Sequence, residues 1–444
     1  MKCKLLLLAF CFMSTISFAD IVLYGRVSAA AENDQFQNST VPGTNNVQDY
    51  GSYFGIRGTD SLYGDTSAVW QLEQLLDISA GQAYYNVSAG GMTVSRRGIS
   101  GINNGRVVSN MNVLASGETY VGIQGGWGRM RLGNLSNYMR ENMGAVDLYN
   151  YGNGDNGFST WSRTTKILPV AIGYDSPTWG GFSFAGQYSF DTNGQRGVSG
   201  IGGTTNFGSG LNGYYSGGVY SMGMGWEYGP YSIQLGSQIF SDVGTYATGT
   251  SGAEIPPGYP QYAAYSDGYA DRLELGFNDP DGLILGIGMQ ITQGLGWFGW
   301  ANSGGSFDNY IYNPGYNVAG LNNNQYQTQE AALSLGYHFG PWTPKIGYAY
   351  GNNMMYGGNI GSILTGTANQ ISNSGYQQAV AELDWNVTLR TIIFINYGQE
   401  WYGSTLQNIS YCGNACSTAG SIVNANNQAF INQSTAAIGL SHTF

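Results

Sequence analysis

Histidine, cysteine and charged residues are scarce in this chain of 444 residues. Only two histidines occur, His338 and His442, and they are remote from each other in the sequence. A catalytic pairing of serine with histidine therefore has little material, and neither histidine lies in a context typical of catalysis. We expect that the protein is not an enzyme and that it needs no cofactor.

Four cysteines are present, of which Cys3 and Cys11 lie in an N-terminal segment that we expect to be removed. The other two, Cys412 and Cys416, are close enough in sequence to form a small disulfide loop in an exported protein. A metal site at this pair is the alternative. It would need further ligands, and both histidines are remote from it.

Charged residues make up 10% of the chain, and the formal net charge is -11. Nucleic acid is therefore a poor partner, because binding to its phosphates relies on basic surfaces. After the N-terminus, no apolar run approaches the roughly 18 residues of a transmembrane helix. These absences argue against both a nucleic-acid-binding protein and a helical membrane protein.

The N-terminus has the three parts of a secretory signal. Lys2 and Lys4 supply the positive start, residues 5–13 the apolar centre, and residues 17–19 the small-residue cleavage site. We predict that residues 1–19 are removed from the mature protein.

A lipoprotein signal ending at Cys11 is the alternative for this segment, but bulky Phe10 stands where that signal needs a small residue. A chain of this length would ordinarily suggest two or three soluble domains, whereas a closed β-barrel can be one domain at this length. We predict that residues 20–444 form a single barrel domain.

Glycine and aromatic residues, by contrast, are abundant: there are 70 glycines, and aromatic residues make up 14% of the chain. This composition suits strands joined by turns better than surface helices. Strand-length segments alternate apolar with polar or small residues, as lipid-facing and lumen-facing positions do in a transmembrane barrel. Near residue 20, Ile21, Leu23 and Val27 alternate in this way with Tyr24 and Arg26.

Short turns and long polar loops also alternate along the chain. Short turns are predicted near 60–65, 125–128, 176–181, 228–230, 278–282, 340–343 and 386–390. Long loops rich in Asn, Gly, Ser and Tyr are predicted at about 32–49, 79–116, 135–165, 191–214, 242–268, 294–326, 352–374 and 403–428. Seven turns and eight loops predict an all-β fold, a 16-stranded antiparallel transmembrane β-barrel.

The stretch from Tyr120 to Asp175 stands out because two short strands around a glycine-rich turn precede a long polar loop. Strand parity places Met130 and Leu132 outward, so that Arg129 and Arg131 point into the lumen. A loop this long is more than a connector. We predict that this loop folds into a pore and determines which solutes pass.

A soluble β-helix or sandwich is the competing architecture, since secreted proteins of that kind are also rich in Gly and Asn. Such a fold does not need alternating turn lengths or a terminal aromatic strand like the one that ends at Phe444. Tryptophans near the predicted strand ends fit the aromatic girdles of a membrane barrel; they are Trp127, Trp179, Trp226, Trp342 and Trp401.

Several segments together resemble the trimeric porins of the neisserial and betaproteobacterial type. They are 23–25, 52–58, 68–74, 120–128, 131–134, 173–177 and the terminal 439–444. The matches run from the mature N-terminus to about residue 190 and resume weakly in the last strands. Each segment alone is a weak signal, whereas their shared order is fairly specific.

The resemblance implies a 16-stranded outer-membrane barrel, a homotrimer packed through outward apolar walls, and a third loop folded inward as the constriction, here about 135–165. It also implies partners: outer-membrane lipids including lipopolysaccharide, the barrel assembly machinery that reads the terminal Phe444, and small hydrophilic solutes. The second loop, about 79–116, is much longer than these porins lead us to expect. It either latches onto a neighbouring subunit or also covers the mouth of the pore.

A diffusion pore needs a narrow polar ring whose charges select solutes. The candidates for this ring are four lumenal arginines and three loop acids, namely Arg26, Arg57, Arg129, Arg131, Glu141, Asp147 and Asp155. Anchoring of strands is the alternative role for Arg26 and Arg57, and at least one loop acid is expected to pin the loop to the wall. Lys345 joins the lumenal set if its strand keeps register.

Basic residues are concentrated between Arg26 and Arg196, and only Arg272, Lys345 and Arg390 follow. Charges beyond about 8 Å are screened at physiological salt, so an acidic barrel can hold a basic constriction. We therefore expect passive diffusion of ions and small solutes with a weak anion preference. A substrate-specific channel lined by tyrosines and a surface adhesin anchored by its barrel are the alternative functions.

Overall fold

The structure is a computed structural model. It describes residues 20–37, 43–76, 78–79, 87–89, 92–94, 115–149, 156–158, 161–162, 164, 167–190, 211–215, 218–247, 266–293, 327–356, 369–370, 372–404 and 432–444. The predicted signal at 1–19, Asp155, Cys412 and Cys416 lie outside the described residues, and so does most of the second loop.

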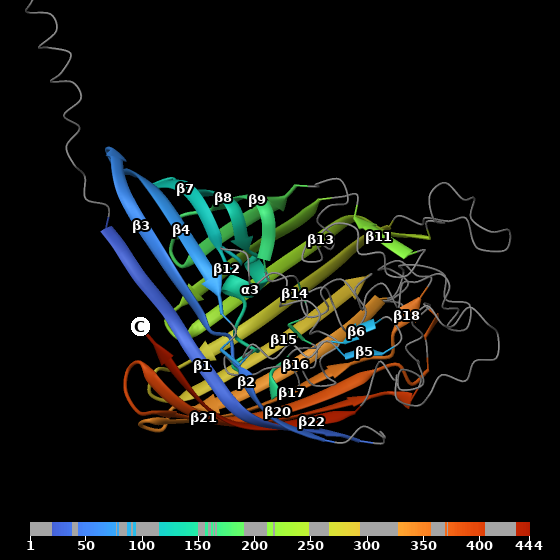
Figure 1. Cartoon of the computed structure of the whole chain (residues 1–444). Helices are drawn as coiled ribbons and strands as arrows, with labels where there is room; N and C mark the ends of the chain where they lie inside the picture. Colours follow the sequence, from blue (N-terminus) through green and yellow to red (C-terminus); the bar gives the residue numbers. More distant parts are fainter. Residues whose placement is uncertain are drawn as a thin grey trace, which may run out of the picture.

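The fold is a closed antiparallel barrel of 16 strands, as predicted. In chain order, the barrel strands are β1 (Asp20–Phe36), β3 (Tyr53–Tyr63), β4 (Thr66–Leu75), β7 (Thr119–Gly125), β8 (Gly128–Ser136), β9 (Ile167–Asp175), β10 (Phe182–Ser189), β12 (Val219–Tyr228), β13 (Tyr231–Ala247), β14 (Ser266–Asn278), β15 (Leu283–Gln293), β16 (Gln327–Tyr337), β17 (Trp342–Gly351), β20 (Tyr376–Asn386), β21 (Thr391–Tyr402) and β22 (Gln433–Thr443). Each strand pairs with its neighbours along the chain (Figure 1).

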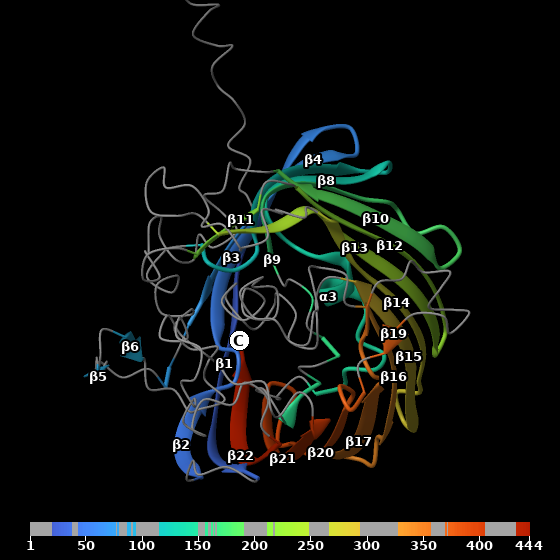
Figure 2. The same cartoon turned by 90° about the vertical axis from the view of Figure 1, so that its right-hand side faces the viewer.

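Among the described residues, six short additional strands accompany the barrel. They are β2 (Thr44–Asp49), β5 (Val87–Ala89), β6 (Met92–Val94), β11 (Leu211–Tyr215), β18 (Met355–Tyr356) and β19 (Asn369–Gln370). Of these, β5 and β6 form a separate two-stranded sheet, and the other four join the barrel sheet. The helix α3 (Tyr138–Asn142) lies inside the ring of strands (Figure 2). In the described part of the chain, no helix is long and apolar enough to cross a membrane.

The first and last strands close the barrel. β1 pairs with β22 from Arg26 opposite Thr443 to Phe36 opposite Gln433. The terminal residue continues this pairing, because the backbones of Gly25 and Phe444 exchange two hydrogen bonds of 3.1 Å. The predicted terminal strand therefore forms one side of the closing seam.

Inward and outward positions alternate as predicted. On β20, Gln378 and Glu382 are buried inside the barrel, whereas Leu383 and Trp385 are exposed on its outer face. On β8, Met130 and Leu132 are exposed and Arg131 is buried. A polar interior behind an apolar outer wall is the pattern of a membrane barrel that encloses an aqueous space.

Seven short turns lie at one end of the barrel and eight longer connections at the other. The first predicted loop, about 32–49, is wrong in its bounds, because β1 runs on to Phe36 and β2 lies within the predicted loop. The upper part of β1 pairs with both β2 and β22, so polar Glu32 and Asp34 stay in the ladder. The polarity of these residues predicted a loop, whereas pairing with the two neighbouring strands β2 and β22 makes them part of a strand.

Tryptophans collect near the short turns. Trp127, Trp179, Trp226 and Trp342 are all exposed there, and Trp342 stacks on Trp385 with ring centroids 5.2 Å apart. Trp401 lies at the opposite end, near the end of β21. Exposed aromatic rings near strand ends suit the boundary between lipid and water.

Candidate pore constriction

The connection between β8 and β9 contains the predicted constriction loop. After β8 ends at Ser136, Asn137 caps α3 by accepting a hydrogen bond of 2.9 Å from the backbone N–H of Arg140. The helix contacts β10, β12 and β13, all on one side of the barrel interior (Figure 2). The described parts of this loop therefore lie against the inner wall.

Glycines on the inner wall make room for the loop. We call the five glycines concerned the glycine track; they are Gly223, Gly236, Gly286, Gly288 and Gly347, on β12, β13, β15 and β17. A Cβ on Gly288 would lie 2.5 Å from the ring of Trp161, and one on Gly236 would lie 2.5 Å from Met143 Sδ. A side chain at these positions would collide with the loop. Because glycine has no side chain, the loop can pack directly on the strands.

Hydrogen bonds hold the loop along this track. Glu274 of β14 accepts bonds from the backbone N–H of Ala145, at 3.0 Å, and from Trp161 Nε1, at 3.3 Å. Arg272 of the same strand donates to the carbonyl oxygen of Trp161 at 2.6 Å. Because Glu274 is fully buried, these donors also satisfy a carboxylate that would otherwise be costly to bury.

The far part of the loop is held in the same way. Lys345 Nζ donates to the carbonyl oxygen of Leu148 at 3.0 Å, to Glu382 at 2.8 Å and to Asp384 at 2.7 Å. Ile346, the next residue, is exposed on the outer face, so this strand keeps the register that placed Lys345 inside. Lys345 is a tether between loop and wall in this arrangement.

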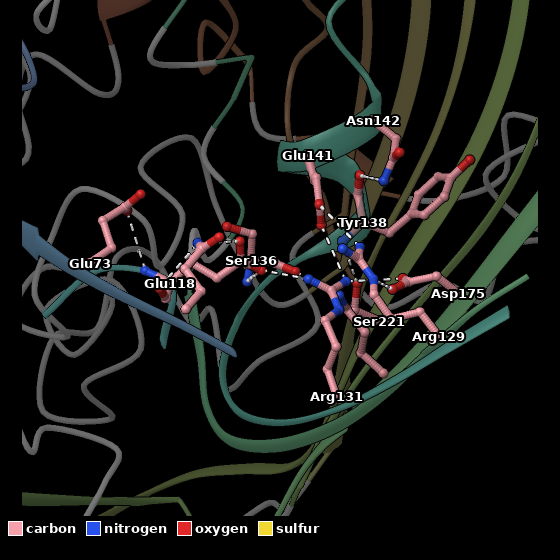
Figure 3. A network of polar contacts seen from close by, with 12 residues as sticks. Glu73, Glu118, Arg129, Arg131, Ser136, Tyr138, Glu141, Asn142, Asp175 and Ser221 are labelled. Atoms are coloured by element: carbon pink, nitrogen blue, oxygen red, sulfur yellow. Dashed lines mark hydrogen bonds and ion pairs between the residues drawn. The ribbon is translucent and has the colours of Figure 1, made fainter. Parts of the chain in front are cut away.

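Arg131 is the centre of an ion-pair cluster where the loop leaves β8 (Figure 3). Its guanidinium lies 2.6 Å from Glu118, 2.9 Å from Asp175 and 3.4 Å from Glu141. Its side chain is only 1% exposed. Arg131 points inward as predicted, but it is buried among carboxylates and braces the root of the loop, so it does not line the water-filled space.

Arg129 and Glu141 lie at the edge of this cluster and reach water. Arg129 Nε donates to Asp175 at 2.9 Å, and its Nη2 lies 4.0 Å from Glu141, with both side chains about one-third exposed. Burial raises the pKa of the Glu141 carboxyl above its ordinary value, and the charge of Arg131 opposes this rise. Arg129 and Glu141 are thus placed where a solute can meet them.

Arg26 and Arg57 occupy lumenal positions on β1 and β3, as predicted. Arg26 donates to the carbonyl oxygens of Gly51, at 2.9 Å, and Tyr50, at 3.3 Å, which matches the anchoring alternative. Arg57 is exposed, and its guanidinium lies 5.2 Å from the centre of the Tyr24 ring. Within the described part of the chain, Arg57 forms no ion pair.

Two other charged loop residues behave differently from each other. Asp147 accepts a bond of 2.6 Å from Ser162 and one of 3.4 Å from the backbone N–H of Tyr149, so it fastens the loop to itself. Arg140 is exposed, and among the described residues it forms no ion pair. Enclosure by the barrel lowers the pKa of the Arg140 guanidinium, and the charge of Asp147 opposes this.

Sequence reasoning did not assign Glu118, Asp175 or Glu274 to the site. Glu118 lies at the end of the long second loop, and Asp175 lies at the end of β9 on the lumenal parity that identified Arg129. Parity could therefore have found Asp175. The roles of Glu118 and Glu274 depend on contacts across loops or strands, which no local pattern reveals.

Inward-facing acids and the exposed arginines differ in their access to water. Several inward acids are buried and accept hydrogen bonds: Glu32 accepts one of 2.6 Å from the Tyr50 hydroxyl, and Glu400 accepts one of 2.7 Å from the Tyr402 hydroxyl. Arg57 and Arg140, in contrast, are exposed. Among the described residues, Arg57 and Arg140 are therefore lumenal charges that water reaches and that no ion pair compensates.

Comparison with known proteins agrees with this architecture. The Gram-negative porin family matches residues 6–400. The major outer membrane protein P.IA of Neisseria meningitidis serogroup A is 23% identical, over 89% of this chain and 93% of that protein. The major outer membrane protein P.IB of Neisseria lactamica is 23% identical, over 95% of this chain and 98% of that protein.

Among solved structures, the anion-selective porin from Comamonas acidovorans shares the fold, with a TM-score of 0.58 and 17% identity over 96% of this chain and all of that one. The relatives and the closed barrel locate the chain in the outer membrane and assign it to channels rather than to enzymes. The match over most of its length shows that the chain belongs to the family of Gram-negative porins.

Proposed function

We propose that this porin is a homotrimer whose third loop, about 135–165, forms the constriction, and that it passes small hydrophilic solutes with a weak preference for anions. The observation that carries the anion preference is the exposed Arg57, which stacks on Tyr24 and forms no ion pair within the described part of the chain. The outward apolar walls supply the surfaces through which three barrels pack.

Local charge governs this preference more than net charge does. Solutes in the lumen interact most strongly with groups inside a screening distance of about 8 Å at physiological salt. Arg57 and Arg140 are exposed, whereas the cluster around Arg131 is compensated by Glu118, Asp175 and Glu141. A permeating anion therefore meets attractive groups at Arg57 and Arg140.

The substitution Arg57→Glu is expected to move the selectivity toward cations, because it reverses the charge of an exposed lumenal group while breaking no ion pair among the described residues. The measurement is the zero-current potential of reconstituted channels in a tenfold KCl gradient. Arg390→Glu is the matched control, since it makes the same charge change in the exposed turn between β20 and β21. Equal potentials for Arg57→Glu and wild type would exclude Arg57 as a selectivity residue.

Lowering the pH is expected to strengthen the anion preference. The raised pKa of Glu141 means that this carboxyl takes up its proton at a higher pH than an ordinary glutamate does, so the loop loses a negative charge as the solution is acidified. The zero-current potential measured between pH 7 and pH 5 tests this expectation. In Glu141→Gln the charge is absent throughout, so the change over this interval should shrink, and an unchanged pH response would contradict the assignment.

A substrate-specific channel and a barrel-anchored adhesin remain the rival functions. Liposome swelling with sugars of graded size separates a general pore from a specific one, because a saturable preference for one sugar would contradict general diffusion. Planar-bilayer recordings separate a channel from an adhesin, and a trimer should close in three equal steps.

A further inference from the structure

An open, cavity-like depression, which we call the cavity, lies beside the ion-pair cluster, at the short-turn end of the barrel. Its volume is about 400 Å³, and it is lined by Asp65, Gln124, Gly125, Gly128, Arg129, Asp175 and Ser176. These residues come from the turn between β3 and β4 and from the adjoining ends of β7, β8 and β9. A space of this size accepts a small organic solute.

The cavity presents positive charge on one side. Arg129 uses Nε to bind Asp175, and its Nη2 is 4.0 Å from Glu141, too far for a hydrogen bond. Its terminal nitrogens therefore keep donors for a ligand, and their planar arrangement suits a carboxylate. Figure 3 shows the Arg129 side chain between Asp175 and the helix that carries Glu141.

Negative charge lies on another side. Asp65 binds the backbone N–H of Gly126 through Oδ2, at 2.9 Å, and is exposed, so Oδ1 keeps its acceptor capacity. Gln124, a further lining residue, has an amide that forms no hydrogen bond within the described part of the chain. The cavity thus offers a carboxylate acceptor, an amide and guanidinium donors.

We propose that this cavity is a subsite for small zwitterionic solutes that carry one carboxylate and one ammonium group, as α-amino acids do. The carboxylate binds the terminal nitrogens of Arg129, the ammonium group binds Asp65, and Gln124 lies along the polar wall. Asp175 also lines the space but is already paired with Arg129 and Arg131, at 2.9 Å each. A zwitterion therefore gains a partner for both of its charges, whereas a pure anion or a pure cation gains a partner for only one. This subsite deepens the proposed diffusion function, because it retards one class of permeating solute at one end of the pore.

The test records single-channel current noise in KCl with added alanine, propionate, ethylamine or glycerol. Alanine is expected to produce concentration-dependent blocking that is stronger when it is added at the short-turn end. Arg129→Gln and Asp65→Asn should each weaken the alanine block by roughly tenfold, because each removes one charge-assisted partner. Asparagine can still accept the bond from Gly126, so Asp65→Asn changes the charge while retaining the turn contact.

Asp279→Asn is the matched control, because it removes one carboxylate from the turn between β14 and β15 at the same end of the barrel. It should leave the alanine block unchanged. A channel that conducts KCl but shows equal noise with alanine and glycerol would overturn the subsite while leaving the diffusion function intact. Equal weakening by Asp279→Asn would assign the effect to general charge and would also overturn it.

Discussion

Replacing Arg131 with methionine is expected to lower the free energy of unfolding by about 3–5 kcal/mol, the range for removing one partner of a buried ion pair. The reason is that Glu118 and Asp175 would lose their shortest contacts to the guanidinium, at 2.6 and 2.9 Å, and Glu118 would stay largely buried. Unfolding of the refolded barrel in urea, followed by tryptophan fluorescence, measures the change.

Arg57→Met is the control for this experiment, because Arg57 is an exposed arginine of the same barrel interior without an ion pair among the described residues. Its effect on the free energy of unfolding should stay within about 0.5 kcal/mol, as for most exposed sites. The double variant Arg131→Met with Glu118→Gln should recover part of the lost free energy of unfolding. It removes the Glu118 carboxylate charge that Arg131→Met alone leaves buried without its arginine partner. Equal stability of Arg131→Met and Arg57→Met would contradict the bracing role.

Gly286→Val is expected to lift the third loop from the wall and to change the unitary conductance markedly. The added Cβ would overlap the carbonyl oxygen of Ala145, which is backbone and cannot rotate away as a side chain can. Overpacking of this kind typically costs about 1–3 kcal/mol. Single-channel conductance and the swelling rate of liposomes in graded sugars report where the loop settles.

Gly186→Val is the matched control, because a Cβ at Gly186 would meet nothing within 4 Å and this glycine is also in a barrel strand. Its conductance and its sugar size limit should equal those of the wild type. If Gly286→Val conducted with wild-type amplitude and the same size limit, contact between the loop and the glycine track would not determine the width of the pore.

The barrel could be predicted from the sequence because its signals are local. Alternation along a strand places Met130 and Leu132 outside and Arg129 inside without knowledge of any partner strand. Short turns containing Gly and Pro fix the hairpins, as at Gly229 and Gly340, whose φ values of 58° and 57° suit glycine. Parity and turn chemistry are properties of a few adjacent residues, so one chain is enough to read them.

The interior contacts could not be predicted because they join residues that are distant in the sequence. Arg131 and Arg57 share lumenal parity, yet one is buried by three carboxylates and the other is exposed. The glycine content of the chain predicts strands and turns in general, whereas Gly286 and Gly288 lie against Ala145 and Trp161 of the loop. Only the closed barrel shows which wall the loop covers.

The most direct test of the central claim is the zero-current potential of the wild-type protein in a planar bilayer under a tenfold KCl gradient at neutral pH. The exposed arginines predict a potential with the sign of chloride preference. A potential with the sign of potassium preference would contradict the account, because buried acids rather than Arg57 and Arg140 would then dominate the lumen.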